Sequence, residues 1–218
     1  MNSLVIPAYN EEKRIERTVK SLLRLSGFEL IFVVRGRDKT YEILSKYKTK
    51  IKIMRFDVKG KWAAIIYGLS KARGNYAGFV DADLPITLDN LRDGFKVAKK
   101  ADLVISSRVN AKRDFKRLVL SRLFNLYTKI LFQLPYNDTQ CGFKVLNKKA
   151  MKLLPLIKGG GWETDVELLC RARKDGLKIF ELPVNWREVK GSKLRFKSIL
   201  SMFFNLLKLR FQLWLSRT

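Results

Sequence analysis

The stretch GNYAGFVDADLP (residues 74–85) joins a short apolar run to a pair of acids. Residues 76–80 have the apolar character of a buried strand, which ends at Asp81 and Asp83, and Pro85 follows two residues later. Two interpretations are open for the acids. They form a turn or cap the next helix, or they hold a cation at the end of the strand. Since aspartate is common in turns, the neighbouring sequence has to decide between them.

Short apolar runs alternate with longer amphipathic segments over about the first half of the chain. Such alternation predicts an α/β fold with a mostly parallel sheet and helices on both of its faces. Ligands of such sheets bind at the carboxyl ends of the strands, which is where the two acids lie. The expected strands are 3–7, 29–34, 51–56, 76–80 and 102–106, and the expected helices are 10–26, 40–48, 61–73 and 87–99.

The second half of the chain changes character. Six of the residues from 108 to 122 are basic and only one is acidic, and an amphipathic helix is expected at 117–134. Further helices are expected near 148–154 and 164–175, with a strand at 177–184. No repeat, linker or low-complexity tract divides the chain, so one compact domain is expected.

The charge of the chain limits its partners. It has 218 residues with 45 Lys and Arg against 20 Asp and Glu, a formal net charge of +25, which attracts nucleic acid, anionic lipid surfaces or phosphorylated substrates. There is no histidine, and the two cysteines have no CxxC spacing, which excludes zinc sites and histidine-based triads. Neither a signal peptide nor a membrane-spanning helix is expected.

Mg²⁺ and Mn²⁺ are usually held by one or two carboxylates together with substrate phosphates. A basic chain with an acid pair at the ligand edge of its sheet fits such a metal–diphosphate site. Gly60 and Lys61 begin a predicted helix, where backbone amides and an ammonium group can meet phosphate. A simple capping turn explains that segment equally well.

Four segments together carry a family resemblance: VIPAYNEE (5–12), GKWAAIIYGLSKARGNYAGFVDADL (60–84), DTQCGFKVL (138–146) and WETDVELLCRARKDGLKIFELPVNWREVKGSKL (162–194). The chain resembles the inverting family-2 glycosyltransferases of GT-A fold, in the branch that loads sugars onto polyprenyl or dolichyl phosphate. The resemblance covers about residues 3 to 210. DTQCGFK and VNWREVKGSK favour dolichyl-phosphate glucosyltransferases, with the mannosyltransferases close behind.

This resemblance implies a role for individual residues. Asp81 and Asp83 would hold Mg²⁺ or Mn²⁺ and the donor diphosphate, and Asp83, Arg108 and Arg117 would be catalytic. The nucleotide-sugar pocket would be formed by Pro7, Tyr9, Asn10, Glu11, Asp38, Lys61, Asp81 and Asp83. The acceptor would be bound by Arg108, Arg117, Asp138, Gln140 and Asp165.

The chain departs from the family in one loop. The family has a DDGSxDxT loop after its second strand, and this chain has VVRGRDKT (33–40), two residues shorter, with Arg35 where an acid is expected. Asp38 and Thr40 are retained. Either base recognition passes to backbone groups and Asp38, or donor binding is weak, or transfer activity is lost and a membrane-associated scaffold remains.

The inferred reaction transfers a hexose, from UDP-glucose as the first expectation and GDP-mannose as the second. A phosphate acceptor arrives deprotonated near neutral pH and needs no general base, which suits a chain without histidine. Inversion at the anomeric carbon would give a β-linked lipid-phosphate sugar. A hydroxyl acceptor remains open as an alternative, and a nucleic-acid-binding protein would explain the charge but not the acid pair.

The C-terminal segment predicts how a lipid acceptor is reached. Residues 1–195 are expected to form the GT-A domain, and 196–218 an amphipathic helix, either part of this domain or an appendage on the membrane surface. The chain is therefore expected on the cytoplasmic face of a membrane, bound peripherally to anionic lipid. Packing of this helix on the domain or on another subunit is the alternative. Its polar stripe is Lys197, Ser201, Asn205, Lys208 and Gln212, and its apolar arc includes Phe203, Phe204, Leu207, Phe211 and Trp214.

Overall fold

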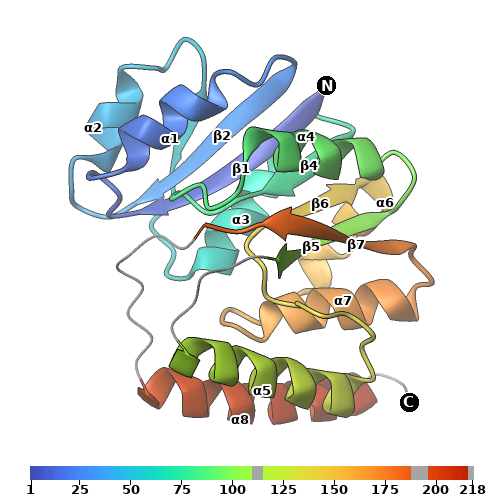
Figure 1. The fold of residues 1–218 in the computed structure, drawn as a ribbon. Coiled ribbons are helices and arrows are strands. Elements are labelled where there is room, and N and C mark those ends of the chain that lie inside the picture. Colours follow the sequence, from blue (N-terminus) through green and yellow to red (C-terminus); the bar gives the residue numbers. More distant parts are fainter. Residues whose placement is uncertain (110–114, 188–195, 216–218) are drawn as a thin grey trace.

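A seven-stranded sheet runs through the computed structural model of the chain, which describes residues 1–109, 115–187 and 196–215 (Figure 1). The strand order is β3-β2-β1-β4-β6-β5-β7, and every pair of neighbours is parallel except the two that involve β6. The mostly parallel sheet predicted from the sequence is confirmed. The strands are β1 (Asn2–Tyr9), β2 (Phe28–Arg35), β3 (Lys52–Arg55), β4 (Tyr76–Phe79), β5 (Leu103–Val109), β6 (Lys144–Asn147) and β7 (Ile179–Asn185).

Helices cover both faces of the sheet, as expected. The side chains of β1 alternate between the faces, with Leu4 and Ile6 on one and Val5 on the other. The first face is covered by α1 (Ile15–Leu22), α2 (Thr40–Ser45) and α4 (Leu88–Val97), which pack in one apolar cluster. The second face is covered by α3 (Lys61–Ser70), α6 (Lys148–Met151), the 3₁₀ turn Leu154–Leu156 and α7 (Thr164–Lys174).

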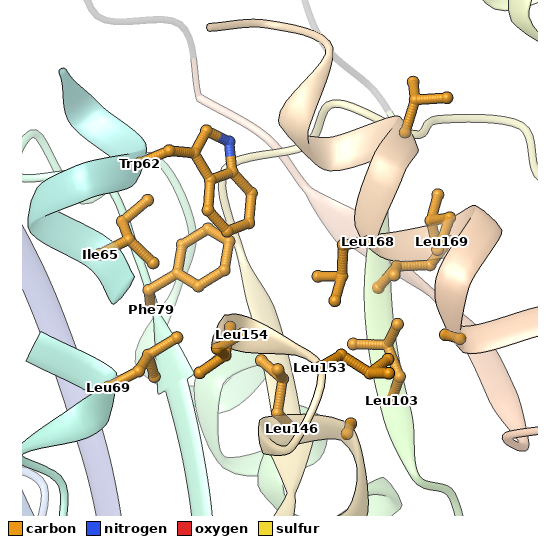
Figure 2. Packing of buried hydrophobic residues seen from close by; sticks show 14 of the residues in the cluster. Trp62, Ile65, Leu69, Phe79, Leu103, Leu146, Leu153, Leu154, Leu168 and Leu169 are labelled. Atoms are coloured by element: carbon orange, nitrogen blue, oxygen red, sulfur yellow. The ribbon is translucent and has the colours of Figure 1, made fainter. Parts of the chain in front are cut away.

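The cluster on the second face fixes the position of α3 and α7 relative to the sheet. Figure 2 shows Trp62 and Ile65 of α3 close to Phe79 of β4, and Leu168 of α7 on the other side of the same cluster. The rings of Trp62 and Phe79 meet edge to face at 5.2 Å between their centroids. This contact places the N-terminus of α3 beside the end of β4, where the acid pair begins.

Two long helices form a further layer next to α7. Figure 1 shows α5 (Phe115–Phe132) and α8 (Phe196–Leu215) side by side, and Phe203 of α8 packs against the rings of Phe124 and Tyr127 of α5. Leu206 of α8 is fully buried in the same cluster as α3 and α7. Part of the predicted apolar arc of α8 thus packs on the domain, while another part stays exposed, namely Phe204, Leu207 and Phe211.

Two details differ from the sequence-based expectation. The strand β6 was not predicted, because its four residues lie in a segment that also contains turn-forming and polar residues. The helix expected from residue 10 begins only at Ile15. The backbone amide of Glu11 donates instead to the side chain of Thr40, at the start of α2, and that of Glu12 to the side chain of Asp38. Among the described residues, no helix combines the length and apolar character needed to cross a membrane.

The packing of α8 can be tested with two adjacent leucines. Leu206 is fully buried and Leu207 is 49% exposed. We expect Leu206→Ala to lower the free energy of unfolding by about 2–5 kcal/mol, because it leaves a cavity in the core, and Leu207→Ala by less than about 1 kcal/mol. Urea unfolding followed by circular dichroism measures both. Equal effects of the two substitutions would contradict the packing described for α8.

Candidate active site

The two acids lie on a tight turn that follows β4. The backbone amide of Leu84 donates to the carbonyl oxygen of Asp81 at 2.9 Å, and Leu84 has a positive φ of 46°, which is uncommon for a residue other than glycine. Thr18 of α1 is buried and donates its hydroxyl to the carbonyl oxygen of Ala82 at 2.7 Å. The turn is therefore held from outside by α1, which fixes the direction of both carboxylates.

The turn borders a cavity of about 410 Å³ at the carboxyl ends of β1, β2 and β4. Among its lining residues, Arg35 places its guanidinium 5.1 Å from the centre of the Tyr9 ring. One part of the cavity wall is thus formed by the Tyr9 ring and the Arg35 guanidinium, and another part by the carboxylates of Asp81 and Asp83. Of the residues predicted to bind the nucleotide sugar, it is lined by Pro7, Tyr9, Glu11, Lys61, Asp81 and Asp83.

The other two predicted nucleotide ligands, Asn10 and Asp38, do not line this cavity but hold the loop beside it. Asn10 has a φ of 52°, and its side-chain oxygen accepts from the amide of Arg37 at 3.2 Å. Asp38 accepts from the amides of Glu12 at 2.9 Å and Thr40 at 3.1 Å. Although partial burial works in the opposite direction, these hydrogen bonds hold the pKa of Asp38 below its ordinary value.

Positive side chains compensate the acids in the first cavity. Lys61 forms an ion pair with Asp81, and Arg14 forms one with Glu11 and lies 3.9 Å from the carboxylate of Asp83. Burial and the neighbouring charge of Asp81 nevertheless raise the pKa of Asp83. Burial also raises the pKa of Glu11, against the effect of Arg14. A cation bound next to Asp83 and Glu11 would therefore stabilise the charged forms of these two carboxyl groups.

The acid pair fits a divalent cation that is completed by its substrate. One carboxylate oxygen of Asp83, Oδ1, is buried and accepts no hydrogen bond. Within the described residues no group of three metal-binding side chains occurs, so a cation here would take its remaining ligands from elsewhere. Mg²⁺ and Mn²⁺ are commonly bound in this way, by one or two carboxylates plus phosphate oxygens and water.

A second cavity of about 240 Å³ adjoins the first, and Lys61 lines both. Gly142 lines this cavity, and a Cβ atom at its position would lie too close to a carboxylate oxygen of Asp81, so a side chain here would collide with that group. Gln140 lines the second cavity and donates to the carbonyl oxygen of Trp162 at 3.1 Å. Asp165, at the start of α7, completes this wall. Two predicted acceptor residues, Gln140 and Asp165, are thus brought together here.

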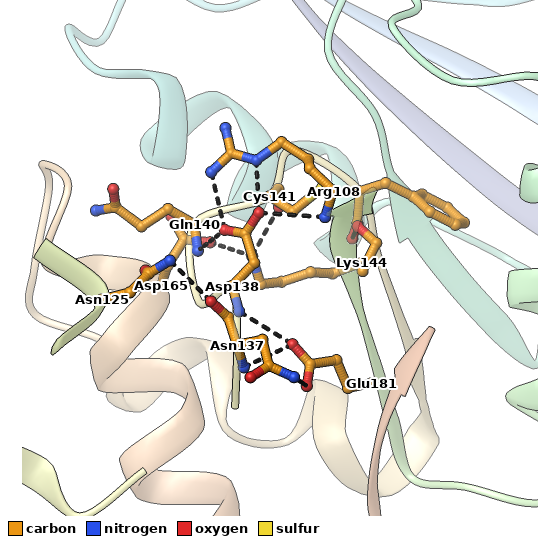
Figure 3. A network of polar contacts seen from close by, with 11 residues as sticks. Arg108, Asn125, Asn137, Asp138, Gln140, Cys141, Lys144, Asp165 and Glu181 are labelled. Atoms are coloured by element: carbon orange, nitrogen blue, oxygen red, sulfur yellow. Dashed lines mark hydrogen bonds and ion pairs between the residues drawn. The ribbon is translucent and has the colours of Figure 1, made fainter. Parts of the chain in front are cut away.

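A buried lysine that the sequence analysis did not single out holds Asp165 in place. Lys144 is 1% exposed, forms an ion pair with Asp165 and donates to the carbonyl oxygen of Cys141 at 2.9 Å (Figure 3). The indole N–H of Trp62 donates to the other oxygen of Asp165 at 3.1 Å. The available signal was a lysine inside the apolar run FKVL, which is the position of a buried strand residue.

The predicted acceptor residues Arg108 and Asp138 form a second buried pair. Arg108 donates to both carboxylate oxygens of Asp138, at 2.5 and 2.8 Å, and Asp138 is 6% exposed (Figure 3). Neither residue lines the two cavities described above. The guanidinium of Arg108 also lies 5.4 Å from the centre of the Trp186 ring. Arg117 belongs to α5, but its side chain lies outside the part of the chain that the structure describes.

Comparison with known proteins gives the family of the chain. Residues 3–154 match Glycosyl transferase family 2. The chain is 29% identical to a dolichyl-phosphate beta-glucosyltransferase of Dictyostelium discoideum, over 96% of this chain and 74% of that protein. It is 33% identical to a dolichyl-phosphate beta-glucosyltransferase of Trichomonas vaginalis, over 95% of this chain and 72% of that protein.

Among solved structures, glucosyl-3-phosphoglycerate synthase from Mycobacterium tuberculosis, in complex with Mn²⁺, UDP and glucosyl-3-phosphoglycerate, has a similar fold. The TM-score is 0.75, with 17% identity over 96% of this chain and 78% of that chain. At this identity the likeness concerns the fold, and the expected GT-A fold is confirmed.

The pairing of Lys144 with Asp165 predicts the outcome of a double-mutant cycle. We expect Lys144→Met to lower the free energy of unfolding by about 3–5 kcal/mol, because it leaves the Asp165 carboxylate buried without its partner. The double variant Lys144→Met/Asp165→Asn should recover part of that loss, since the uncompensated charge is gone. Guanidinium unfolding measures each variant. Strictly additive losses would show that the two side chains do not depend on each other.

Proposed function

The chain belongs to glycosyl transferase family 2, and from this premise we propose that it transfers a hexose from a nucleotide sugar to the phosphate of a polyprenyl lipid such as dolichyl phosphate. That it is a glycosyltransferase rests on the family match and on its relatives. The names of those relatives support glucose as the sugar and dolichyl phosphate as the acceptor. UDP-glucose is the donor we expect first, and GDP-mannose second.

One observation carries the proposal: Lys61, which forms an ion pair with Asp81 of the acid pair, lines both cavities. The cavity of about 410 Å³ offers Tyr9 and Arg35 to a nucleotide, and the cavity of about 240 Å³ offers Trp162, Gln140 and Asp165 to a sugar. A donor that spans the two cavities would have its diphosphate beside Lys61 and the two aspartates.

The residues around the diphosphate would either bind the metal ion, neutralise charge or support the turn that carries the acid pair. Asp81 and Asp83 would hold Mg²⁺ or Mn²⁺, which when bound neutralises the charge that develops on the leaving diphosphate. Lys61 is half-exposed and already faces the same place, so its ammonium can add to that neutralisation. Gly142 leaves room for the Asp81 carboxylate, and Thr18 holds the turn that carries both acids.

The state of the nearby carboxylates supports a phosphate acceptor rather than a hydroxyl acceptor. A hydroxyl needs a general base, and the chain has no histidine. Asp165 is occupied by Lys144 and Trp62, and Asp138 by Arg108. A phosphate monoester brings its own negative oxygen, so what it needs is position and positive charge. We propose Arg108 and Arg117 for this task.

The altered loop after β2 is compatible with donor binding. Arg35 replaces the expected acid, and it lies over Tyr9 at the cavity wall rather than in an ion pair that would block the space. Asp38 holds the loop through backbone amides. We therefore favour recognition of the base by backbone groups and the Tyr9–Arg35 pair over a loss of activity.

The exposed faces of α5 and α8 support a peripheral position on a membrane. Ile130 of α5 is 71% exposed and Phe204 of α8 is 69% exposed, and the exposed Lys208 stands beside Leu207. Apolar side chains of this size on adjacent helices, with lysine next to them, suit the headgroup layer of an anionic membrane. We propose that residues 1–195 carry catalysis and that α8 packs on them and contributes this surface.

The role of the acid pair predicts a loss of activity without a loss of fold. We expect Asp81→Asn and Asp83→Asn to lower kcat about a hundredfold to a thousandfold, because a neutral amide cannot hold the cation and diphosphate in the transition state. Asp93→Asn, at an exposed acid on α4, is the matched control. The assay offers a panel of nucleotide sugars with Mg²⁺ or Mn²⁺ and a short polyprenyl phosphate, and follows which sugar becomes soluble in organic solvent.

Several outcomes of that panel would reject the proposal. Transfer that is unchanged in Asp81→Asn and Asp83→Asn would remove the acid pair from the reaction. Transfer to a free sugar but not to a polyprenyl phosphate would identify a hydroxyl acceptor. No transfer and no hydrolysis of any donor would favour a scaffold without activity.

The membrane surface predicts a loss of vesicle binding. We expect Ile130→Gln/Phe204→Gln to weaken binding to anionic vesicles at least about a hundredfold, because each of the two apolar side chains contributes about 1.5–3 kcal/mol when fully buried. The matched control is Val58→Gln/Leu156→Gln, which changes two exposed apolar residues outside α5 and α8. Co-sedimentation with vesicles measures both. Equal binding by the two double variants would place the membrane contact elsewhere.

A further inference from the structure

A third cavity, of about 660 Å³, lies on the other side of the acid turn and has no role in the proposed transfer. It shares Asp83 with the first cavity and none of its other lining residues. Its walls come from α1, from residues 84–88 and from the end of β7 with the two residues that follow. It is therefore a separate space at the same edge of the sheet.

The charge of this cavity is strongly positive. Four arginines line it, Arg14, Arg17, Arg24 and Arg187, and Asp83 is the one acid among its lining residues. Arg14 is compensated by Glu11 and faces Asp83. Among the described residues, the side chains of the other three arginines have no acid or hydrogen-bond partner. Three guanidinium groups around one hollow repel each other unless an anion lies between them.

The backbone holds the two arginine-bearing walls in place. Arg17 and Ser21 lie four residues apart on α1, and Arg24 lies in the turn that directly follows this helix; all three line the cavity. On the other wall, the amide of Arg187 donates to the carbonyl oxygen of Pro85 at 2.8 Å, and the amide of Trp186 to that of Val109 at 3.3 Å. The walls therefore do not depend on the arginine side chains for their position.

Other groups in the cavity suit a phosphate. Thr87 caps the ten-residue helix α4 and lines the cavity together with Leu88, so the positive end of the α4 dipole lies at its wall. Ser21, which carries a hydroxyl group, lines the same cavity as Arg17 and Arg24. The ring of Trp186 provides an apolar wall for the part of a ligand that carries the phosphate.

We propose that this cavity is a second anion site that binds a phosphate-bearing ligand, with Arg17, Arg24 and Arg187 as its charged partners. Guanidinium groups bind phosphate oxygens in pairs of parallel hydrogen bonds, which gives both charge and direction. The phosphate belongs either to a small soluble molecule or to a lipid headgroup. The site is distinct from the donor cavities, because neither Lys61 nor Asp81 lines it.

The test uses calorimetric titration of the full chain with inorganic phosphate and diphosphate, in the presence of EDTA. The site variant is Arg17→Gln/Arg24→Gln, which leaves Arg14 at the acid pair unchanged. The matched control, Lys99→Gln/Lys100→Gln, removes the same charge from exposed residues that follow α4. A third variant, Lys61→Met, removes the ammonium group that diphosphate would meet in the donor cavities.

We expect saturable diphosphate binding that persists in Lys61→Met and in the lysine control and becomes at least about tenfold weaker in Arg17→Gln/Arg24→Gln, since charged hydrogen bonds are lost. If diphosphate binding weakens equally in the arginine and lysine variants, the loss is explained by the lower net charge alone. That result would overturn the proposal. Loss in Lys61→Met with no change in the arginine variant would assign the binding to the donor cavities and overturn it as well.

Vesicles distinguish the two sources of phosphate. Phosphatidylcholine vesicles with and without phosphatidic acid are offered to the arginine variant and the lysine control. Weaker binding of the arginine variant to phosphatidic acid vesicles, relative to the control, identifies a lipid headgroup as the ligand. Equal vesicle binding combined with weakened diphosphate binding identifies a soluble phosphate. If wild-type protein binds neither probe saturably, the proposal is wrong.

Discussion

The site depends on how the charge of Asp81 and Asp83 is compensated. Two carboxylates close together at the edge of a sheet repel each other, and burial makes the charge of Asp83 still more costly. Lys61 and Arg14 supply counter-charges from α3 and from the turn before α1, so the pair is tolerated before any ligand arrives. The compensation is incomplete, because Asp83 keeps a buried oxygen without a hydrogen bond. A cation that brings phosphate with it is the simplest group that would complete it.

The helices and strands around the acid pair hold the turn at residues 81–84 in place. Trp62 and Phe79 set α3 against β4, which brings Lys61 to Asp81, and Thr18 ties the turn to α1 on the other face of the sheet. The antiparallel strand β6 enters between β4 and β5 and carries Lys144 into the core, where it fixes Asp165. Two buried ion pairs, Lys144–Asp165 and Arg108–Asp138, hold these side chains in fixed positions, and Asp165 also lines the second cavity. Pairs of this kind add little to stability but impose one arrangement on the groups around them, which is what a binding site requires.

Much of the fold and part of the site could be predicted from the sequence. Short continuous apolar runs identified the strands of the first half, because those strands are buried on both faces, and amphipathic segments identified its helices. The strand β6 was not predicted because its short apolar run is interrupted by Lys144 and lies between turn-forming and polar residues. Lys144 was not singled out because lysine is rarely buried, although its place in the apolar run FKVL is that of a buried strand residue. The roles of Asn10 and Asp38 as loop supports depend on hydrogen bonds between segments about 26 residues apart. The cluster of Arg17, Arg24 and Arg187 joins the first helix to the end of the last strand, and only the folded chain brings them together.

The burial of Leu206 has a consequence for how the protein is made. The helix that carries it is translated after every strand of the sheet, yet it fills a space in the same apolar cluster as Trp62 and Leu168. While the chain is still being synthesised, that cluster has an open side, and α5 lacks the neighbour that covers Phe124. Nascent chains with such surfaces are prone to associate with other apolar surfaces. The open side closes only when α8 packs on α5 and on the cluster.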